Sequence, residues 1–249
     1  MTYPRSRILK ALALSSLGGA ALGGLTACPG GGPTVIRGSG PVVQEQRTFR
    51  PIERIELRGR VDLSVLVLPS EEGALLESTG PETVVFLEGA SDLLSWVETT
   101  LDGTTLTLRF RDDVRLDPLP SIEVQTARLL GISSVGSGDV RLSGVTSFAT
   151  RGSALSIAMT GSGDLAAEGA VDTLEVRHVG SGDLDLRHLR SRTASYSGLG
   201  SGDAWVHVKD SLRSRLTGTG DLYLLGDVPD ERVDSETIGS AELRRERDR

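Results

Sequence analysis

The chain has 249 residues, of which 38% are hydrophobic, 24% are charged and only 4% are aromatic. This composition is typical of a globular chain that forms one large domain or two small ones, and it excludes a core built from a few bulky aromatic side chains. The formal net charge is −7. Because an acidic surface repels phosphate backbones, we expect no nucleic-acid partner.

Residues 1–27 have the features of an export signal. Arg5, Arg7 and Lys10 precede the apolar stretch ALALSSLGGAALGGL (residues 11–25), which is too short and too rich in glycine for a membrane span. The stretch ends in LTAC, which resembles the bacterial lipoprotein box, and its Cys28 is the only cysteine of the chain. We therefore predict a lipoprotein signal peptide at residues 1–27 and lipidation at Cys28. The alternative is an ordinary secretory signal followed by a chance cysteine.

Lipidation with two or more acyl chains gives stable membrane anchoring. Because the chain has a single cysteine, no internal disulfide can stabilise the fold. The sequence after Cys28, PGGGP, cannot bury apolar surface, so we predict a lipidated cysteine and flexible tether at residues 28–40. The last eight residues, ELRRERDR, predict a charged tail at residues 242–249, which leaves residues 41–241 as the folded domain.

One tetrapeptide recurs through the second half of the chain. GSGD begins at Gly136, Gly161, Gly180 and Gly200, GTGD begins at Gly218, and a weaker copy, GSAE, begins at Gly239. A repeat of roughly 20 residues is typical of a stacked solenoid.

The positions around each tetrapeptide alternate between apolar and polar residues. Six residues before the first glycine stand Leu130, Leu155, Leu174, Ala194, Leu212 and Val233. Four residues before it stand Ile132, Ile157, Val176, Tyr196, Ser214 and Ser235. After the aspartate, the same parity selects Val140 and Leu142, Leu165 and Ala167, Leu184 and Leu186, Ala204 and Val206, and Leu222 and Leu224. This alternation predicts two short strands per copy, each with one buried face, joined at a G-S/T-G-D corner.

We therefore predict an all-β fold, a parallel β-helix in which each strand pairs with its equivalent in the next coil. A sharp bend that recurs at every level, about 4.8 Å apart, needs glycine at the same place in each coil. Ile55 and Leu57 before Gly59, followed by Asp62, repeat the pattern, so the solenoid begins well before Gly136. Residues 70–121 depart from the period, and their register stays open.

The exported chain resembles the auto-transporter adhesins with a head GIN domain. The resemblance rests on GSG at residues 38–40, FRPIERIELRGRVDLSV at residues 49–65, DLLSWVETTLDGTTLTLRF at residues 92–110 and the GSGD coils. It implies a right-handed parallel β-helix exported to the bacterial envelope, often as a lipoprotein. It supplies no catalytic residue and no cofactor.

The repeated aspartates predict a column of carboxylates along the corner. The column consists of Asp139, Asp164, Asp183, Asp203 and Asp221. Two carboxylates about 4.8 Å apart repel each other by roughly 0.9 kcal/mol even in water. We expect each carboxylate to accept local backbone N–H groups in an Asx-type turn, which makes the column structural. Binding of cations such as Ca²⁺ is the alternative.

A second candidate site lies two residues after the aspartate, on the outward face. Trp205 and Tyr223 occupy this position in the last two full copies, with His207 and Leu225 two residues further on. A contiguous apolar and aromatic patch predicts a platform for a sugar ring or a partner protein. The alternative is that the tail or a loop covers the patch.

Signals of an enzyme are weak. His178, His188 and His207 are scattered, and the chain has no H-x-x-x-H or C-x-x-C pair that would predict a metal centre. We therefore predict a non-enzymatic, lipid-anchored module that binds, adheres or scaffolds in the bacterial envelope. The residue after Cys28 is Pro29 and not the aspartate that is associated with inner-membrane retention, which favours a location in the outer membrane. A polysaccharide-active β-helix enzyme and a purely structural envelope protein are the alternatives.

Overall fold

The computed structural model describes residues 34–68, 82–111, 114–146 and 153–246, which belong to one compact unit, Pro33–Arg249. The predicted signal peptide, Cys28 and the PGGGP sequence lie outside the described residues. No helix in the described ranges is long and apolar enough to cross a membrane.

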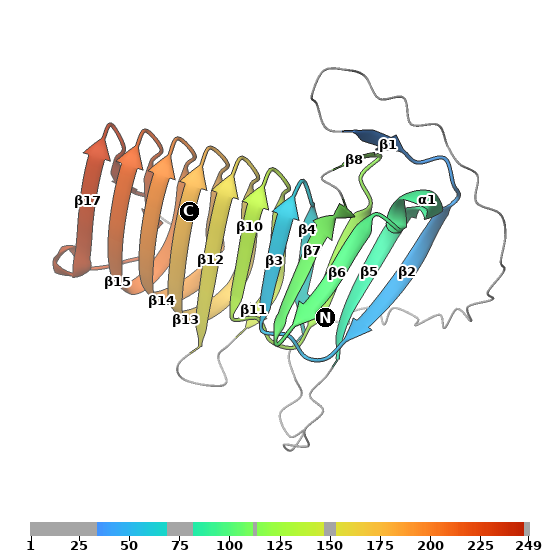
Figure 1. Ribbon diagram of the computed structural model, residues 1–249. Coiled ribbons are helices and arrows are strands. Elements are labelled where there is room, and N and C mark those ends of the chain that lie inside the picture. The colour runs from blue at the N-terminus through green and yellow to red at the C-terminus, as the bar shows by residue number, and fades with distance from the viewer. Residues whose placement is uncertain (1–33, 69–81, 112–113, 147–152, 247–249) are drawn as a thin grey trace, which may run out of the picture. The chain divides into compact units, whose positions relative to one another are not determined.

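The repeat region forms the predicted β-helix, with successive strands stacked in parallel (Figure 1). The row that ends at the glycine corners contains β3 (Arg54–Gly59), β10 (Gly131–Gly136), β12 (Ala154–Gly161), β13 (Leu165–Gly180), β14 (Leu184–Gly200), β15 (Ala204–Gly218) and β17 (Val233–Gly239). The row that follows the corners contains β4 (Leu63–Val67), β11 (Val140–Thr146), the first halves of β13, β14 and β15, β16 (Leu222–Leu225) and β18 (Leu243–Arg245). A 3₁₀ turn, η2 (Asp230–Arg232), precedes β17.

The first glycine of every copy lies in register with that of the next coil. Gly59 pairs with Gly136, and the same alignment continues through to Gly239. The second bend of each coil is softer, because β13, β14 and β15 pass through it as continuous strands with register shifts, as between Ala166 and Glu168. The predicted pattern at Gly59 and Asp62 is therefore a true coil of the solenoid.

The described parts of residues 70–121 break the period because their strands form an antiparallel cap at the N-terminal end of the stack. β2 (Val42–Phe49) pairs antiparallel with β5 (Thr83–Ala90), which pairs antiparallel with β9 (Ser121–Thr126). β6 (Val97–Asp102) and β7 (Thr105–Phe110) form a hairpin, and the short helix α1 (Ser91–Leu94) follows β5. β7 and β9 then pair in parallel with the first coil, which continues the sheet into the solenoid.

Both predicted boundaries of the folded domain shift outward. β1 (Val35–Arg37) pairs with β8 (Arg115–Asp117), and the N–H groups of Ser39 and Gly40 donate to the Asp92 carboxylate. Residues 34–40 are thus part of the fold and not tether. The predicted tail begins with β18, which pairs with β16 and adds the last strand of the second row.

In the coils most of the predicted inward positions form the core, and the cap adds buried residues such as Val85 and Leu87. Leu155, Leu174 and Leu212 are buried six residues before the glycine, and every predicted inward position after the aspartate is buried. Leu130 is half-buried. Val233 is half-buried and Ser235 is exposed because both belong to β17, the last strand of its row. Ser214 Oγ donates to Ser235 Oγ at 2.8 Å, so the interior becomes polar where it meets water at the last coil.

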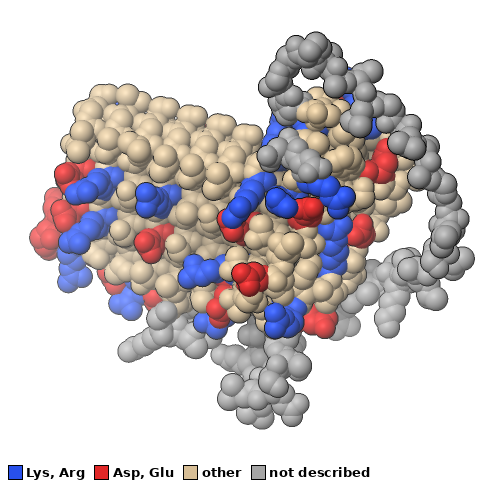
Figure 2. All heavy atoms as spheres, in the orientation of Figure 1, with Lys and Arg blue, Asp and Glu red and all other residues tan. Residues whose placement is uncertain are grey.

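The corners require glycine because the backbones of neighbouring coils lie very close together there. Gly161 has φ +132°, and a Cβ placed on it would lie 1.8 Å from the carbonyl oxygen of Gly136 in the coil before. Figure 2 shows that the edge where these strands end carries no charged side chain on the face in view, whereas charges of both signs mix over the strands. Two ion pairs join neighbouring coils, Arg213 with Asp234 and Arg215 with Glu236.

Candidate functional site

The aspartate column is a ladder of hydrogen bonds between coils. In each coil Oδ1 of the aspartate accepts the backbone N–H of the aspartate one coil further on, for example Asp139 from Asp164 at 3.0 Å and Asp164 from Asp183 at 2.8 Å. The ladder begins at Asp62, whose carboxylate accepts from Asp139, and ends at Glu242, whose N–H donates to Asp221. The expectation of local Asx-type turns was therefore wrong in its partner, although the carboxylates do accept backbone N–H groups.

The partner changes because the strands of successive coils are stacked in parallel, which aims the aspartate N–H along the solenoid axis. A charge-assisted hydrogen bond from the backbone offsets part of the repulsion between carboxylates at successive levels. In the described ranges no three His, Cys, Asp or Glu side chains come close enough together to hold a metal ion.

The aromatic pair has a geometry that the sequence did not predict. Trp205 and Tyr223 are in register on β15 and β16, and their rings are stacked, with centroids 5.0 Å apart and an interplanar angle of 8°. Both residues are half-buried. The rings stack because equivalent positions in neighbouring coils lie about 4.8 Å apart, which is close to the separation of stacked aromatic rings.

Guanidinium groups cover both ends of this stack. The Arg187 guanidinium lies 5.2 Å from the Trp205 ring centroid, and the Arg244 guanidinium lies 6.0 Å from the Tyr223 ring centroid. We call Arg187, Trp205, Tyr223 and Arg244 the aromatic column. The faces of the two rings point at each other and toward the guanidinium groups, so the column does not offer the continuous apolar face that the sequence suggested.

Each guanidinium of the aromatic column is held by carboxylates. Arg187 donates from Nε and Nη2 to the two carboxylate oxygens of Asp185 at 2.9 and 2.6 Å, and these hydrogen bonds lower the Asp185 pKa and raise the Arg187 pKa. Arg244 Nη2 lies 3.0 Å from Asp221 Oδ2 and 3.2 Å from Glu242 Oε2. The charge of Asp221 is the main cause of the raised pKa of Arg244. The planar groups of the column are therefore fixed before any ligand arrives.

The two remaining residues of the predicted patch differ. His207 is half-buried, and its Nδ1 lies 3.2 Å from the carbonyl oxygen of Arg187. Leu225 is buried, with only 8% of its surface exposed, which contradicts its predicted outward position. The alternation ends there because Leu225 is the last residue of β16 and Gly226, with φ +94°, turns the chain. Because Arg244 belongs to β18, the predicted tail supplies one end of the column.

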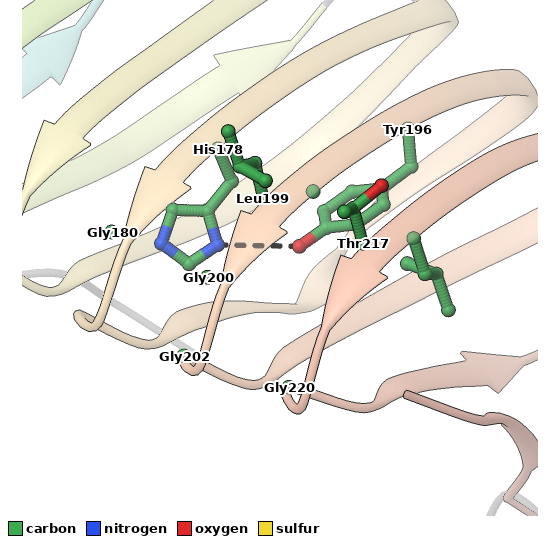
Figure 3. Close-up of a pocket in the computed structure, with 10 residues that line it drawn as sticks. His178, Gly180, Tyr196, Leu199, Gly200, Gly202, Thr217 and Gly220 are labelled. Carbon is green, nitrogen blue, oxygen red and sulfur yellow. Dashed lines mark hydrogen bonds between the residues drawn. The ribbon is translucent and has the colours of Figure 1, made fainter. Parts of the chain in front are cut away.

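The interior contains a histidine and a tyrosine from neighbouring coils (Figure 3). His178 Nδ1 lies 3.2 Å from the Tyr196 hydroxyl, and both side chains are buried. Burial lowers the pKa of His178 and raises the pKa of Tyr196. The ring of Tyr196 occupies the space beside Gly198, where a Cβ would lie 2.8 Å from it. The cavity here is only about 10 Å³ in volume, which leaves room for little more than a water molecule, so we assign the pair to the core.

A larger hollow of about 270 Å³ lies at the N-terminal end of the aspartate ladder. It is lined by Asp62, Leu63, Ser64, Ser121, Ile122, Asp139, Val140 and Arg141. Sequence reasoning missed it, because it forms where β9 of the antiparallel cap meets the regular coils. Ser121 lies in a segment that does not follow the repeat, so the sequence did not predict that it would line this hollow.

Comparisons with known proteins agree on the fold. The family model described as "Putative auto-transporter adhesin, head GIN domain" matches residues 74–228. A "putative adhesin" from Bacteroides fragilis is similar in structure, with a TM-score of 0.64 and 18% identity over 85% of this chain and 100% of its own chain. A "putative adhesin" from Parabacteroides merdae has a TM-score of 0.50 and 16% identity over 85% of this chain and 99% of its own. No curated protein matches the sequence.

Proposed function

Because the chain belongs to the auto-transporter adhesin family with a head GIN domain, we propose that it is an adhesion-like binding module of the bacterial cell envelope. In this proposal a lipid on Cys28 holds the protein to a membrane, and the outer face of the last coils carries the binding surface. The adhesin descriptions of the family and of its structural neighbours favour a role without catalysis.

The observation that carries the proposal is the aromatic column. At the same outward position, earlier coils have Arg141, Ala166 and Asp185, so the fold does not require an aromatic residue there. Only the last full coils place Trp205 and Tyr223 at this position and bracket them with arginines. Trp, Tyr and Arg are the residue types in which binding energy concentrates at interfaces, and here all three are rigidly held.

Anchoring is tested with Cys28→Ser. Because Cys28 is the only cysteine, we expect the variant to leave the membrane fraction and to be recovered in soluble form with an unchanged melting temperature. Persistence of the variant on membranes after a high-salt wash would contradict lipid anchoring.

Binding is tested with the double variant Trp205→Ala and Tyr223→Ala, which reproduces the small residue that Ala166 supplies in an earlier coil. We expect attachment of the purified protein to envelope fragments or cells to fall at least tenfold. Leu199→Ala is the matched control, since Leu199 is an apolar side chain with 53% exposure that lies away from the column. Equal attachment by the parent and both variants would favour the purely structural alternative.

A further inference from the structure

We propose that the aromatic column binds a neutral oligosaccharide through two carboxylate–guanidinium pairs, Asp185 with Arg187 and Glu242 with Arg244, and not through its ring faces. This inference rests on the proposed function, because it names the ligand class of the same surface.

Hydrogen-bonding capacity favours hydroxyl groups. A hydroxyl donates one hydrogen bond and accepts two, so it is best met by a donor and an acceptor side by side. Arg187 uses two of its five N–H donors on Asp185, and the remaining donors stand beside carboxylate oxygens that can accept further bonds. Arg244 and Glu242 repeat the arrangement at the other end of the stack, with Arg244 Nε 3.2 Å from Glu242 Oε2.

The stacking of the rings leaves their edges for contact with a ligand. Because Trp205 and Tyr223 are stacked face to face, it is their edges that are available to a ligand, and aromatic edges carry partial positive charge. The indole N–H and the phenol O–H are further donors. Such edges attract the oxygens of a polyhydroxy ligand more than they attract an apolar group.

Local charge disfavours an anionic ligand. The carboxylates of Asp185, Asp221 and Glu242 slightly outnumber the guanidinium groups of Arg187 and Arg244 that they bind. The chain as a whole is also acidic, with a net charge of −7. An anionic glycan would therefore be repelled both by the excess of carboxylates at the column and by the net charge of the whole chain.

Apolar exposure disfavours a protein partner that inserts an apolar anchor. The strongly exposed large hydrophobic residues of the described ranges are Val35, Val42, Val43, Leu68, Val135, Leu199 and Ile238. None of them belongs to the aromatic column, whose rings are half-buried. An apolar hot spot of a partner would therefore meet no strongly exposed large hydrophobic residue in the column.

The spacing of the two pairs sets the length of the ligand. Asp185 lies on β14 and Arg244 on β18, and the register Asp185–Trp205–Tyr223–Arg244 places three strand spacings between them. Three spacings correspond to about 14 Å along the axis. This span exceeds a single sugar ring, so a ligand that contacts both pairs is an oligosaccharide that lies along the solenoid axis.

The test uses the full-length protein with Cys28→Ser and calorimetric titration with neutral gluco-, manno- and galacto-oligosaccharides, their monosaccharides, and acidic oligogalacturonides as probes. We expect at least one neutral oligosaccharide series to bind, with longer chains binding at least tenfold more tightly than the monosaccharide. Arg187→Gln and Arg244→Gln should each weaken that binding about tenfold, which corresponds to a loss of about 1.4 kcal/mol. Arg213→Gln, which removes an exposed inter-coil pair outside the column, should leave it unchanged.

Three results would overturn this inference. They are no binding of any neutral series, tighter binding of the acidic oligogalacturonides, and equal losses in Arg187→Gln, Arg244→Gln and the Arg213→Gln control. The variants of Trp205 and Tyr223 keep the two proposals separate. If these variants lose attachment to cells while no neutral oligosaccharide binds the parent, the ligand class is wrong and the binding surface stands. If they attach like the parent, the binding surface itself is wrong.

Discussion

A methyl group added at Gly182 should cost about 3 kcal/mol of folding free energy. A Cβ built on Gly182 would lie 2.1 Å from the carbonyl oxygen of Gly163 in the preceding coil, whereas real Cβ atoms essentially never come closer than 3.0 Å to another heavy atom. Overpacking costs about 1–3 kcal/mol, and we expect the upper end because the contact is with backbone and not with a flexible side chain. The ladder hydrogen bond from Asp183 N–H to Asp164 holds the two coils together beside this contact.

Gly182→Ala should therefore lower the melting temperature by about 6–12 °C, since 1 kcal/mol corresponds to about 2–4 °C in a domain of this size. Thermal unfolding followed by circular dichroism measures the shift. Ser181→Ala is the neighbouring control and should stay within about 0.5 kcal/mol of the parent, because Ser181 is exposed. Gly59→Ala separates backbone strain from steric contact, since Gly59 has φ +90° but no atom within 4 Å of its Cβ position. A Gly182→Ala protein that melts like Ser181→Ala would refute the close approach of the coils.

Two further predictions concern pH and cations. Burial lowers the His178 pKa below its ordinary 6.5, so below that pH the unfolded chain binds more protons than the folded chain. The stabilisation should be fully present above pH 6.5 and should fall as the pH drops toward the folded-state pKa. His178→Met, which copies Met159 of the preceding coil, should remove this pH dependence from the free energy of unfolding measured with urea. A parent and variant with the same pH profile would exclude His178 as the cause. Because the aspartate carboxylates already accept backbone N–H groups, EDTA should leave the melting temperature unchanged, and Asp183→Asn should cost about 1 kcal/mol. A rise in melting temperature with Ca²⁺ that is lost in Asp183→Asn would instead identify the column as a cation site.

The regular part of the fold was predictable because the repeat carries its own register. Once the glycines are aligned, the parity of Leu174 and Leu184 determines which side chains enter the core, and both are buried. The same alignment correctly extended the solenoid to Gly59. The cap was not predictable, since the antiparallel pairing of β2, β5 and β9 depends on contacts between segments that share no repeat.

The candidate surface was predictable only in part. Parity placed Trp205 and Tyr223 on the outer face, but it could not show that their rings stack face to face or that Arg187 and Arg244 cover the ends. It misplaced Leu225, because alternation fails where a strand ends in a turn. It also assigned the aspartates to local turns, since sequence reasoning sees neighbours along the chain before neighbours along the axis.

The aspartate ladder makes one coil interchangeable with another. Each carboxylate accepts from a main-chain N–H of the coil that follows, so the bond does not depend on the identity of the residue that donates, as the Glu242 N–H at the end of the ladder illustrates. Gene duplication of a whole coil, such as residues 184–203, would therefore insert a unit that forms ladder hydrogen bonds with the coils on both sides of it. Repeat number in such a protein can change by entire coils while both ends keep their own structures, which leaves the length of the solenoid free to evolve separately from the surface at its C-terminal end.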